Sequence, residues 1–118
     1  MQAESAFQLT DETFQKEALE FPGVVLVDFW APWCGPCRAM TPVIEGLVKK
    51  FEGNPKVRIA QLNVDEAPET QNAYSIVSIP SLIVFVGGQP SDMKVGVTPP
   101  PALEKLIEEA LAKLPKTA

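Results

Sequence analysis

The sequence predicts an α/β fold, with a central mixed β-sheet of about five strands flanked by about four helices. Two observations support this. Short apolar runs alternate with segments whose apolar residues recur at helical spacing. One run, Val24 to Trp30, is apolar along nearly its whole length, as expected for a central strand covered on both faces. With 118 residues, the chain is expected to form one domain over residues 1–118.

The first elements lie ahead of this central strand. Phe7 to Leu9 is expected to be a short strand. Thr10 is predicted to cap the next helix, because two acids follow it where the helix dipole favours negative charge. That helix is expected to run to about Glu20 and to end before Pro22-Gly23.

The second helix is expected to span Cys34 to Phe51, directly after the central strand. Its apolar residues share one face, and they are Met40, Val43, Ile44, Leu47, Val48 and Phe51. Pro42 lies inside this helix, where it removes one backbone hydrogen bond and is expected to kink the axis.

The second half of the chain is expected to add a strand, a short helix and a hairpin. The strand is Val57 to Val64, after which Asp65 is predicted to cap a helix that ends near Tyr74. The hairpin is Ser81 to Val86 paired with Met93 to Val97 across a turn that contains two glycines.

The last helix is expected to begin after Thr98 as its cap, with three prolines in its first turn, where missing N–H groups cost little. Its apolar stripe is Leu103, Leu106, Ile107, Ala110, Leu111 and Leu114, and Pro115 is expected to end it.

The composition narrows the functional classes. Apolar residues make up 46% of the chain and the net charge is −5 without any histidine, so a basic nucleic-acid-binding face is not expected. No apolar run approaches the roughly 20 residues of a membrane helix. Residues Met1 to Ser5 lack the features of a signal peptide. We therefore expect a cytoplasmic monomer that binds neither nucleic acid nor membrane.

The segment Trp33-Cys34-Gly35-Pro36-Cys37 holds the only two cysteines of the chain. A structural disulfide closing so small a loop would stabilise by only about 2 kcal/mol. A structural zinc site needs four ligands, and the chain has no histidine and no second cysteine pair. Two unreactive buried cysteines remain an alternative. A redox-active pair is the preferred interpretation, and no bound metal is expected.

The position of the pair predicts its chemistry. Cys34 begins a helix, where free N–H groups and the dipole stabilise a thiolate, so it is expected to be the accessible, attacking cysteine. Cys37 lies one turn inside and is expected to attack the sulfur of Cys34 and release reduced substrate. Pro36 fixes the first turn, and Gly35 leaves room for a substrate chain.

The stretch from Val27 to Cys37 resembles the thioredoxin family. Further segments match in the same order and at similar spacing, among them Leu9-Thr10-Asp11, Leu62-Asn63-Val64-Asp65, Ile79-Pro80-Ser81-Leu82 and Lys94-Val95-Gly96. The resemblance covers about Phe7 to Leu114. It implies a thioredoxin fold and a general protein disulfide reductase that acts by dithiol–disulfide exchange through a redox disulfide between Cys34 and Cys37.

The resemblance also implies roles for other residues. Asp28 matches the family's buried acid, which transfers a proton to or from Cys37; an Asp on a solvent-facing side of the strand is the alternative. Pro80 matches a cis-proline beside the disulfide. The remaining substrate-binding positions that match the family are Trp33, Ile79, Val95 and Gly96.

The family's partners are carried over as expectations. No cofactor is bound, and electrons come from NADPH through thioredoxin reductase, a flavin enzyme. Expected substrates are disulfide-containing proteins such as ribonucleotide reductase, peroxiredoxin and methionine sulfoxide reductase. An oxidising or isomerising exchanger is one alternative, although Pro36 favours a reductant over families that carry histidine there. A binding protein with incidental cysteines is another.

The chain departs from the family pattern at three places. Gln61 stands where a lysine is usual, near the buried acid, and it cannot supply a positive charge. Val77-Ser78 replaces a more polar, glycine-containing pair before Ile79-Pro80, and Val86-Gly87 replaces a Lys-Asn turn. These changes bear on substrate preference and on Asp28, not on the reaction class.

Overall fold

The computed structural model describes residues 3–115, so both ends of the expected 1–118 domain, Met1 and Gln2 included, lie outside the described residues. Within this range five strands form one sheet in the order β1-β3-β2-β4-β5. The strands are β1 (Phe7–Leu9), β2 (Val24–Trp30), β3 (Val57–Asn63), β4 (Ser81–Val86) and β5 (Gln89–Val95). The helices are α1 (Asp11–Phe14), continued by a π-helical segment η1 (Gln15–Leu19), α2 (Gly35–Lys50), α3 (Pro68–Ala73) and α4 (Pro100–Ala112).

The sheet is mixed, as predicted. β1 and β2 both run parallel to β3, whereas β4 is antiparallel to β2 and β5 is antiparallel to β4. The central strand β2 has the predicted bounds, and all seven of its residues are buried. A strand buried on both faces needs apolar side chains throughout, which explains why Val24 to Trp30 could be recognised from sequence.

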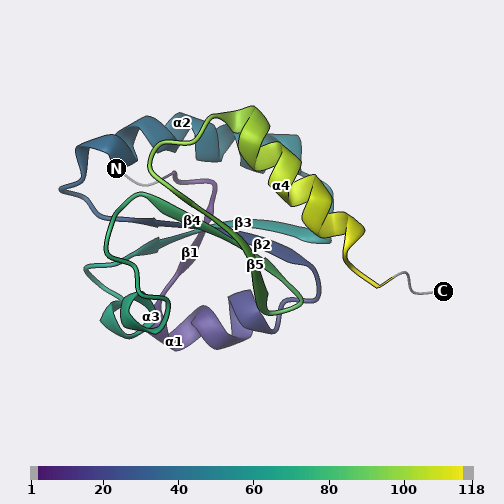
Figure 1. The fold of residues 1–118 in the computed structure, drawn as a ribbon, viewed down its shortest axis with the longest axis horizontal. Helices are drawn as coiled ribbons and strands as arrows, with labels where there is room; N and C mark the ends of the chain where they lie inside the picture. Colours follow the sequence, from purple (N-terminus) through teal and green to yellow (C-terminus); the bar gives the residue numbers. More distant parts are fainter. Residues whose placement is uncertain (1–2, 116–118) are drawn as a thin grey trace.

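Helices cover both faces of the sheet (Figure 1). On one face α2 and α4 pack over Leu26, with buried side chains that include Met40, Ile44, Leu47, Leu103 and Ile107. On the other face α1, η1 and the segment around α3 pack over Val25, Val27 and Phe29, with buried side chains that include Phe14, Ala18, Ala67 and Ile76. Alternation along β2 therefore divides the core into two layers.

Two of the predicted caps are wrong. α3 has Ala67 at its N-cap with no side-chain hydrogen bond, because Asp65 stands two residues earlier and its carboxylate bonds elsewhere. α4 has Pro99 at its N-cap, and the Thr98 hydroxyl donates to the carbonyl oxygen of Gly96 instead. The predicted cap Thr10 is confirmed, since its hydroxyl accepts from the backbone N–H of Thr13 at 3.2 Å.

Both outer strands of the sheet are interrupted or short. β1 has only three residues. β5 begins at Gln89, four residues earlier than predicted, and it includes Pro90. The pairing of β5 with β4 shifts register between Val84 and Phe85, which marks a bulge. Proline lacks the N–H of a ladder bond, so its place on an outer strand fits the position of β5.

Candidate functional site

Cys34 and Cys37 form a disulfide at the start of α2, with an S–S distance of 2.29 Å. Cys34 is the N-cap of this helix, and its sulfur accepts a hydrogen bond from the backbone N–H of Cys37 at 3.2 Å. Pro36 stands in the first turn, where a missing N–H is harmless. Cys34 is 4% exposed and Cys37 is 2% exposed, so the expected difference in accessibility is small in this oxidised state.

The loop before β4 brings a backbone edge to the disulfide. The Ile79–Pro80 peptide bond is cis, in agreement with the expectation from resemblance. The carbonyl oxygen of Ile79 lies 3.7 Å from Sγ of Cys34. Gly96, at the end of β5, donates its N–H to the carbonyl oxygen of Pro80 at 2.8 Å and adopts φ of 93°. The predicted residues Ile79 and Pro80 therefore lie beside the disulfide, and Gly96, which comes from a later segment, lies next to them.

Trp33 is held beside the cysteines by a residue that the sequence did not indicate. Its side chain is 68% exposed, and Nε1 donates to both carboxylate oxygens of Asp65 at 3.1 Å. Asp65 follows β3, so only the folded arrangement of β2 and β3 brings it near Trp33. A single acid after a strand has no distinguishing pattern, which explains why it was interpreted as a helix cap.

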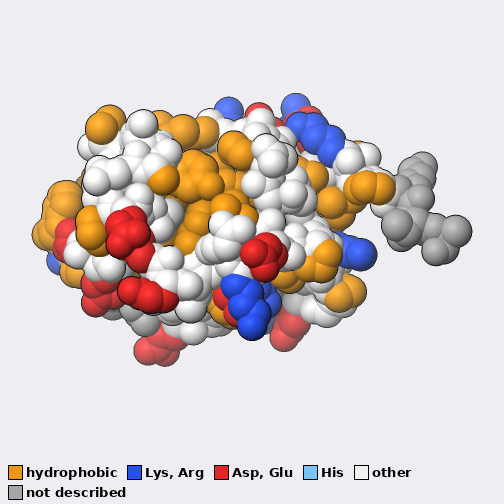
Figure 2. Space-filling model, turned by 90° about the horizontal axis from the view of Figure 1, so that it is seen from below, with side chains coloured by type: hydrophobic (Ala, Val, Ile, Leu, Met, Phe, Trp, Pro, Cys, Tyr) orange, Lys and Arg blue, Asp and Glu red, His pale blue; other side chains and the backbone are white. Residues whose placement is uncertain are grey.

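Several exposed apolar side chains belong to the site segments or their neighbours. Predicted Val95 is 61% exposed, Val97 is 53% exposed, and Val77, two residues before Ile79, is 93% exposed. Figure 2, which keeps the left–right direction of Figure 1, shows apolar side chains at the end of the molecule where α2 begins, in addition to a larger group near the middle of this face. The sequence marked Val77 only as a departure from the family pattern, yet its exposure makes it available to a docked chain.

Asp28 is fully buried in the middle of β2, so the solvent-facing alternative is wrong. Val24 and Leu26, which alternate with Asp28 along the strand, contact the α2 side of the sheet, and Asp28 therefore faces the helix that carries Cys37. Oδ2 of Asp28 accepts a hydrogen bond from Nε2 of Gln61 at 3.0 Å, whereas Oδ1 is buried without a hydrogen bond from the described residues.

Burial raises the pKa of the Asp28 carboxyl from 3.8 to about 6, and the hydrogen bond from Gln61 acts in the opposite direction. A buried carboxyl resists ionisation because its charged form loses water. With a pKa of about 6, Asp28 is able to accept and return a proton near neutral pH.

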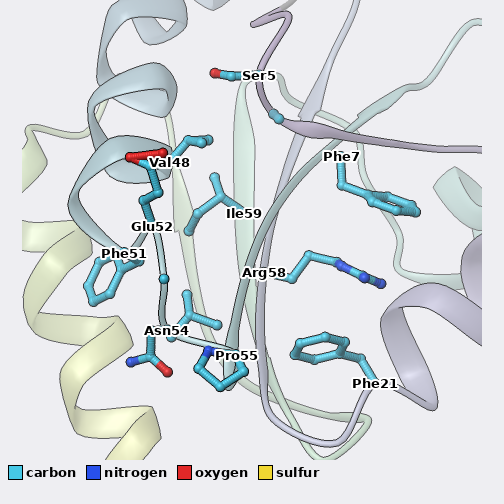
Figure 3. A pocket seen from close by; sticks show the side chains of 13 residues that line it. Ser5, Phe7, Phe21, Val48, Phe51, Glu52, Asn54, Pro55, Arg58 and Ile59 are labelled. Carbon is cyan, nitrogen blue, oxygen red and sulfur yellow. The ribbon is translucent and has the colours of Figure 1, made fainter.

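A pocket of about 520 Å³ lies away from these residues (Figure 3). It is bounded by the chain before β1, the end of α2 and the start of β3, and it contains none of the predicted site residues. Arg58 lies there between the rings of Phe7 and Phe21, 4.2 and 4.6 Å from the two ring centres. Its role in the fold is structural, since Nη1 of Arg58 also bonds to Glu17 at 3.0 Å.

Among residues 3–115, no group of three or more His, Cys, Asp or Glu side chains is placed to hold a metal ion. In the same part of the chain, no helix has the length and apolar character needed to cross a bilayer.

Comparison with known proteins assigns the family. A family model described as Thioredoxin matches residues 5–109. The chain is 46% identical over 107 residues to Thioredoxin 1 of Nostoc sp., which covers 91% of this chain and 98% of that protein. It is 48% identical over 103 residues to Thioredoxin 2 of Chlorobaculum tepidum, covering 87% and 93%. It is also 45% identical over 105 residues to chloroplastic Thioredoxin M4 of Arabidopsis thaliana, covering 89% and 53%.

The predicted fold, family and reaction class are confirmed by these matches and by the paired cysteines. Thioredoxins are disulfide oxidoreductases, and a cysteine pair at the start of a helix has the placement that dithiol–disulfide exchange requires. The chain belongs to the thioredoxin family.

Proposed function

We propose that this chain is a general reductant of protein disulfides, with Cys34 as the attacking and Cys37 as the resolving cysteine. The observation that carries the assignment is the helix cap at Cys34, whose sulfur accepts the N–H of Cys37. An N–H aimed at sulfur favours the negatively charged thiolate over the thiol.

The reaction proceeds in two exchange steps. The Cys34 thiolate attacks one sulfur of the substrate disulfide, a mixed disulfide forms, and the other substrate sulfur leaves as a thiolate that takes a proton from water. Cys37 then loses its proton to Asp28 and attacks Sγ of Cys34. The Cys34–Cys37 disulfide forms, and the second substrate sulfur leaves as a thiolate that is protonated as Asp28 gives up its proton. Two electrons pass from the cysteine pair to the substrate.

Substrate docking is assigned to the surface around the disulfide. Trp33 and Val95 offer exposed apolar area. The cis-proline segment Ile79-Pro80 offers a backbone edge to an extended substrate chain, as resemblance to the family implies, and Gly96 supports this segment through its hydrogen bond to Pro80. Gly35, which is exposed at the start of α2, leaves room for that chain to approach Cys34.

Finer assignments follow from the family. We propose that the chain works as a monomeric single domain over residues 1–118 in the cytoplasm, as an electron carrier. Electrons come from NADPH through thioredoxin reductase. Its targets are disulfide proteins of the ribonucleotide reductase, peroxiredoxin and methionine sulfoxide reductase types.

Reduction of insulin tests the proposal. The parent protein is expected to accelerate insulin reduction by dithiothreitol, and Cys34→Ser is expected to abolish the acceleration. Cys37→Ser should instead trap a mixed disulfide with the substrate. A parent protein that does not accelerate the reaction, or a Cys34→Ser variant as active as the parent, contradicts the proposal. Replacing dithiothreitol by NADPH and a bacterial thioredoxin reductase then tests the electron source.

A further inference from the structure

Asp28 is the end of a row of polar residues that crosses three strands. Gln8 of β1 is paired with Gln61 of β3, and Gln61 is paired with Asp28 of β2. Residues paired in register across parallel strands project toward the same face of a sheet. The three polar side chains therefore project toward the α2 face, where Asp28 and Gln61 are buried in an otherwise apolar layer and Gln8 lies at the exposed edge of the sheet.

The hydrogen bonds along this row fix the direction of the Gln61 amide. Its Oε1 accepts the backbone N–H of Ala3 at 2.8 Å and the side-chain Nε2 of Gln8 at 3.3 Å. Its Nε2 donates to Oδ2 of Asp28 at 3.0 Å. Turning the amide over would place its NH2 group against two donors and its oxygen against a carboxylate. Only the observed direction satisfies all three contacts.

The chain before β1 is itself held in place. Ala3 and Ala6 are buried in the core layer that contains Met40 and Ile44 of α2. Nε2 of Gln8 also lies 3.2 Å from the carbonyl oxygen of Ala3 and 3.1 Å from that of Ala6. The N–H of Ala3 is thus presented to Gln61 by a packed, hydrogen-bonded turn.

The elements packed around Asp28 contribute almost entirely apolar side chains. The buried side chains of α2 are Cys37, Met40, Ile44 and Leu47, those of α4 are Leu103, Leu106, Ile107 and Ala110, and the β4 residue paired with Asp28 is Leu82. Among these described residues only Cys37 carries an ionisable group, and only when its disulfide with Cys34 is reduced. Gln61 is also the one described side chain that forms a hydrogen bond with Asp28.

We propose that Gln61 is a positioning residue for proton transfer by Asp28, and that the segment from Ala3 to Gln8 keeps the Gln61 amide in its working direction. This inference rests on the proposed role of Asp28 as the proton acceptor for Cys37. The bond from Gln61 holds Oδ2, which leaves Oδ1 to receive the proton. The proton moves from Sγ of Cys37 to Oδ1 of Asp28, and the Cys37 thiolate then attacks Sγ of Cys34 and displaces the substrate sulfur.

Substitutions at Gln61 separate positioning from stability. Gln61→Leu removes the donor to the carboxylate and should raise the Asp28 titration midpoint by about one pH unit. Such a shift lowers insulin-reduction kcat about fivefold near pH 6, with a return toward the parent value above pH 8. Gln61→Lys loses the bonds to Ala3 and Gln8 but brings a positive charge to Asp28, so it should move the midpoint below that of the parent.

The measurements are the 13C NMR titration of the Asp28 carboxyl in the oxidised protein and the pH profile of kcat. Gln15→Leu, a surface change of the same kind, serves as the matched control, because Gln15 is exposed on the opposite face of the sheet. The pH dependence of dithiothreitol is common to all variants and cancels in ratios to the parent. An unmoved midpoint in Gln61→Leu overturns the role of Gln61.

A double-mutant cycle tests the N-terminal segment. Gln8→Leu should raise the Asp28 midpoint by less than Gln61→Leu does, and it should have no further effect when Gln61 is already leucine. A shift of equal size in both backgrounds, or no shift in either, shows that the segment only contributes stability.

If NMR shows the expected shifts while kcat keeps its pH profile, the geometry holds and Asp28 is not the proton acceptor. A parent that fails to reduce insulin instead refutes the proposed function.

Discussion

The backbone N–H of Cys37 donates a hydrogen bond to the sulfur of Cys34 across 3.2 Å. In the reduced protein this bond stabilises a thiolate on Cys34 and not on Cys37. Limiting iodoacetamide near neutral pH should therefore label Cys34 in large excess. Peptide mapping by mass spectrometry measures the ratio, with the urea-unfolded protein as the control. Predominant labelling of Cys37 contradicts the assignment.

Asp65 holds the indole of Trp33 in one orientation over the site. Asp65→Ala removes that acceptor, and with it a hydrogen bond that contributes about 1 kcal/mol to holding the indole in place. KM for insulin should therefore rise by about twofold to fivefold, with little change in kcat. Steady-state kinetics and tryptophan fluorescence check this, and Glu66→Ala, an exposed neighbour, is the matched control. Unchanged KM and fluorescence would mean that Trp33 is oriented by packing alone.

The buried Asp28 lowers stability above pH 6. Its pKa is about 6 in the folded protein and 3.8 in ordinary surroundings, so the folded state binds the proton more tightly. The free energy of unfolding therefore falls as pH rises from about 4 to 6 and stays lowered above that. Asp28→Asn should be more stable than the parent at pH 7–8, by at most about 3 kcal/mol for a shift of two units, and slower in turnover.

Urea unfolding of the parent and Asp28→Asn from pH 4 to pH 8 checks this dependence. The stability difference between the two proteins should shrink toward pH 4, where both side chains are neutral. A variant less stable than the parent at pH 8 would show that the carboxylate is well compensated by its surroundings.

Arg58 joins the outer part of the sheet to η1. Its guanidinium lies between Phe7 and Phe21 and bonds to the carboxylate and backbone of Glu17. Arg58→Ala should lower the free energy of unfolding by about 1–3 kcal/mol through lost stacking and packing. Arg58→Lys should retain the charge but recover only part of that loss, because an ammonium has no planar face. Urea unfolding measures both, with Lys56→Ala as the surface control.

The sequence predicted most of the elements because their patterns are local. The unbroken apolar run of β2 and the apolar face of α2 are each visible within a single segment. Asp65 was misinterpreted because its partner, Trp33, is distant in sequence, and Thr98 because three prolines imitate a capped start. The π-helical turn of η1 has no comparable signature.

The site was predicted in its parts but not in its connections. Resemblance to the family identified Asp28 as a candidate and showed that Gln61 lacks the charge of the usual lysine. It did not reveal that the Gln61 amide oxygen accepts hydrogen bonds from Ala3 and Gln8. The alignment of Gln8, Gln61 and Asp28 depends on how three strands pair. Strand register is a property of the whole sheet, and single segments do not determine it.

The two outer strands also bear on how the protein behaves when it is concentrated. An exposed strand edge is a template on which another chain adds, and this is a common first step toward aggregation. Here one edge is only three residues long, and the other carries a proline, a bulge and the exposed Lys94. Neither edge presents a long unbroken series of backbone donors and acceptors. Edge-to-edge pairing of strands between molecules is therefore disfavoured, and the protein should resist this route to aggregation in concentrated solution.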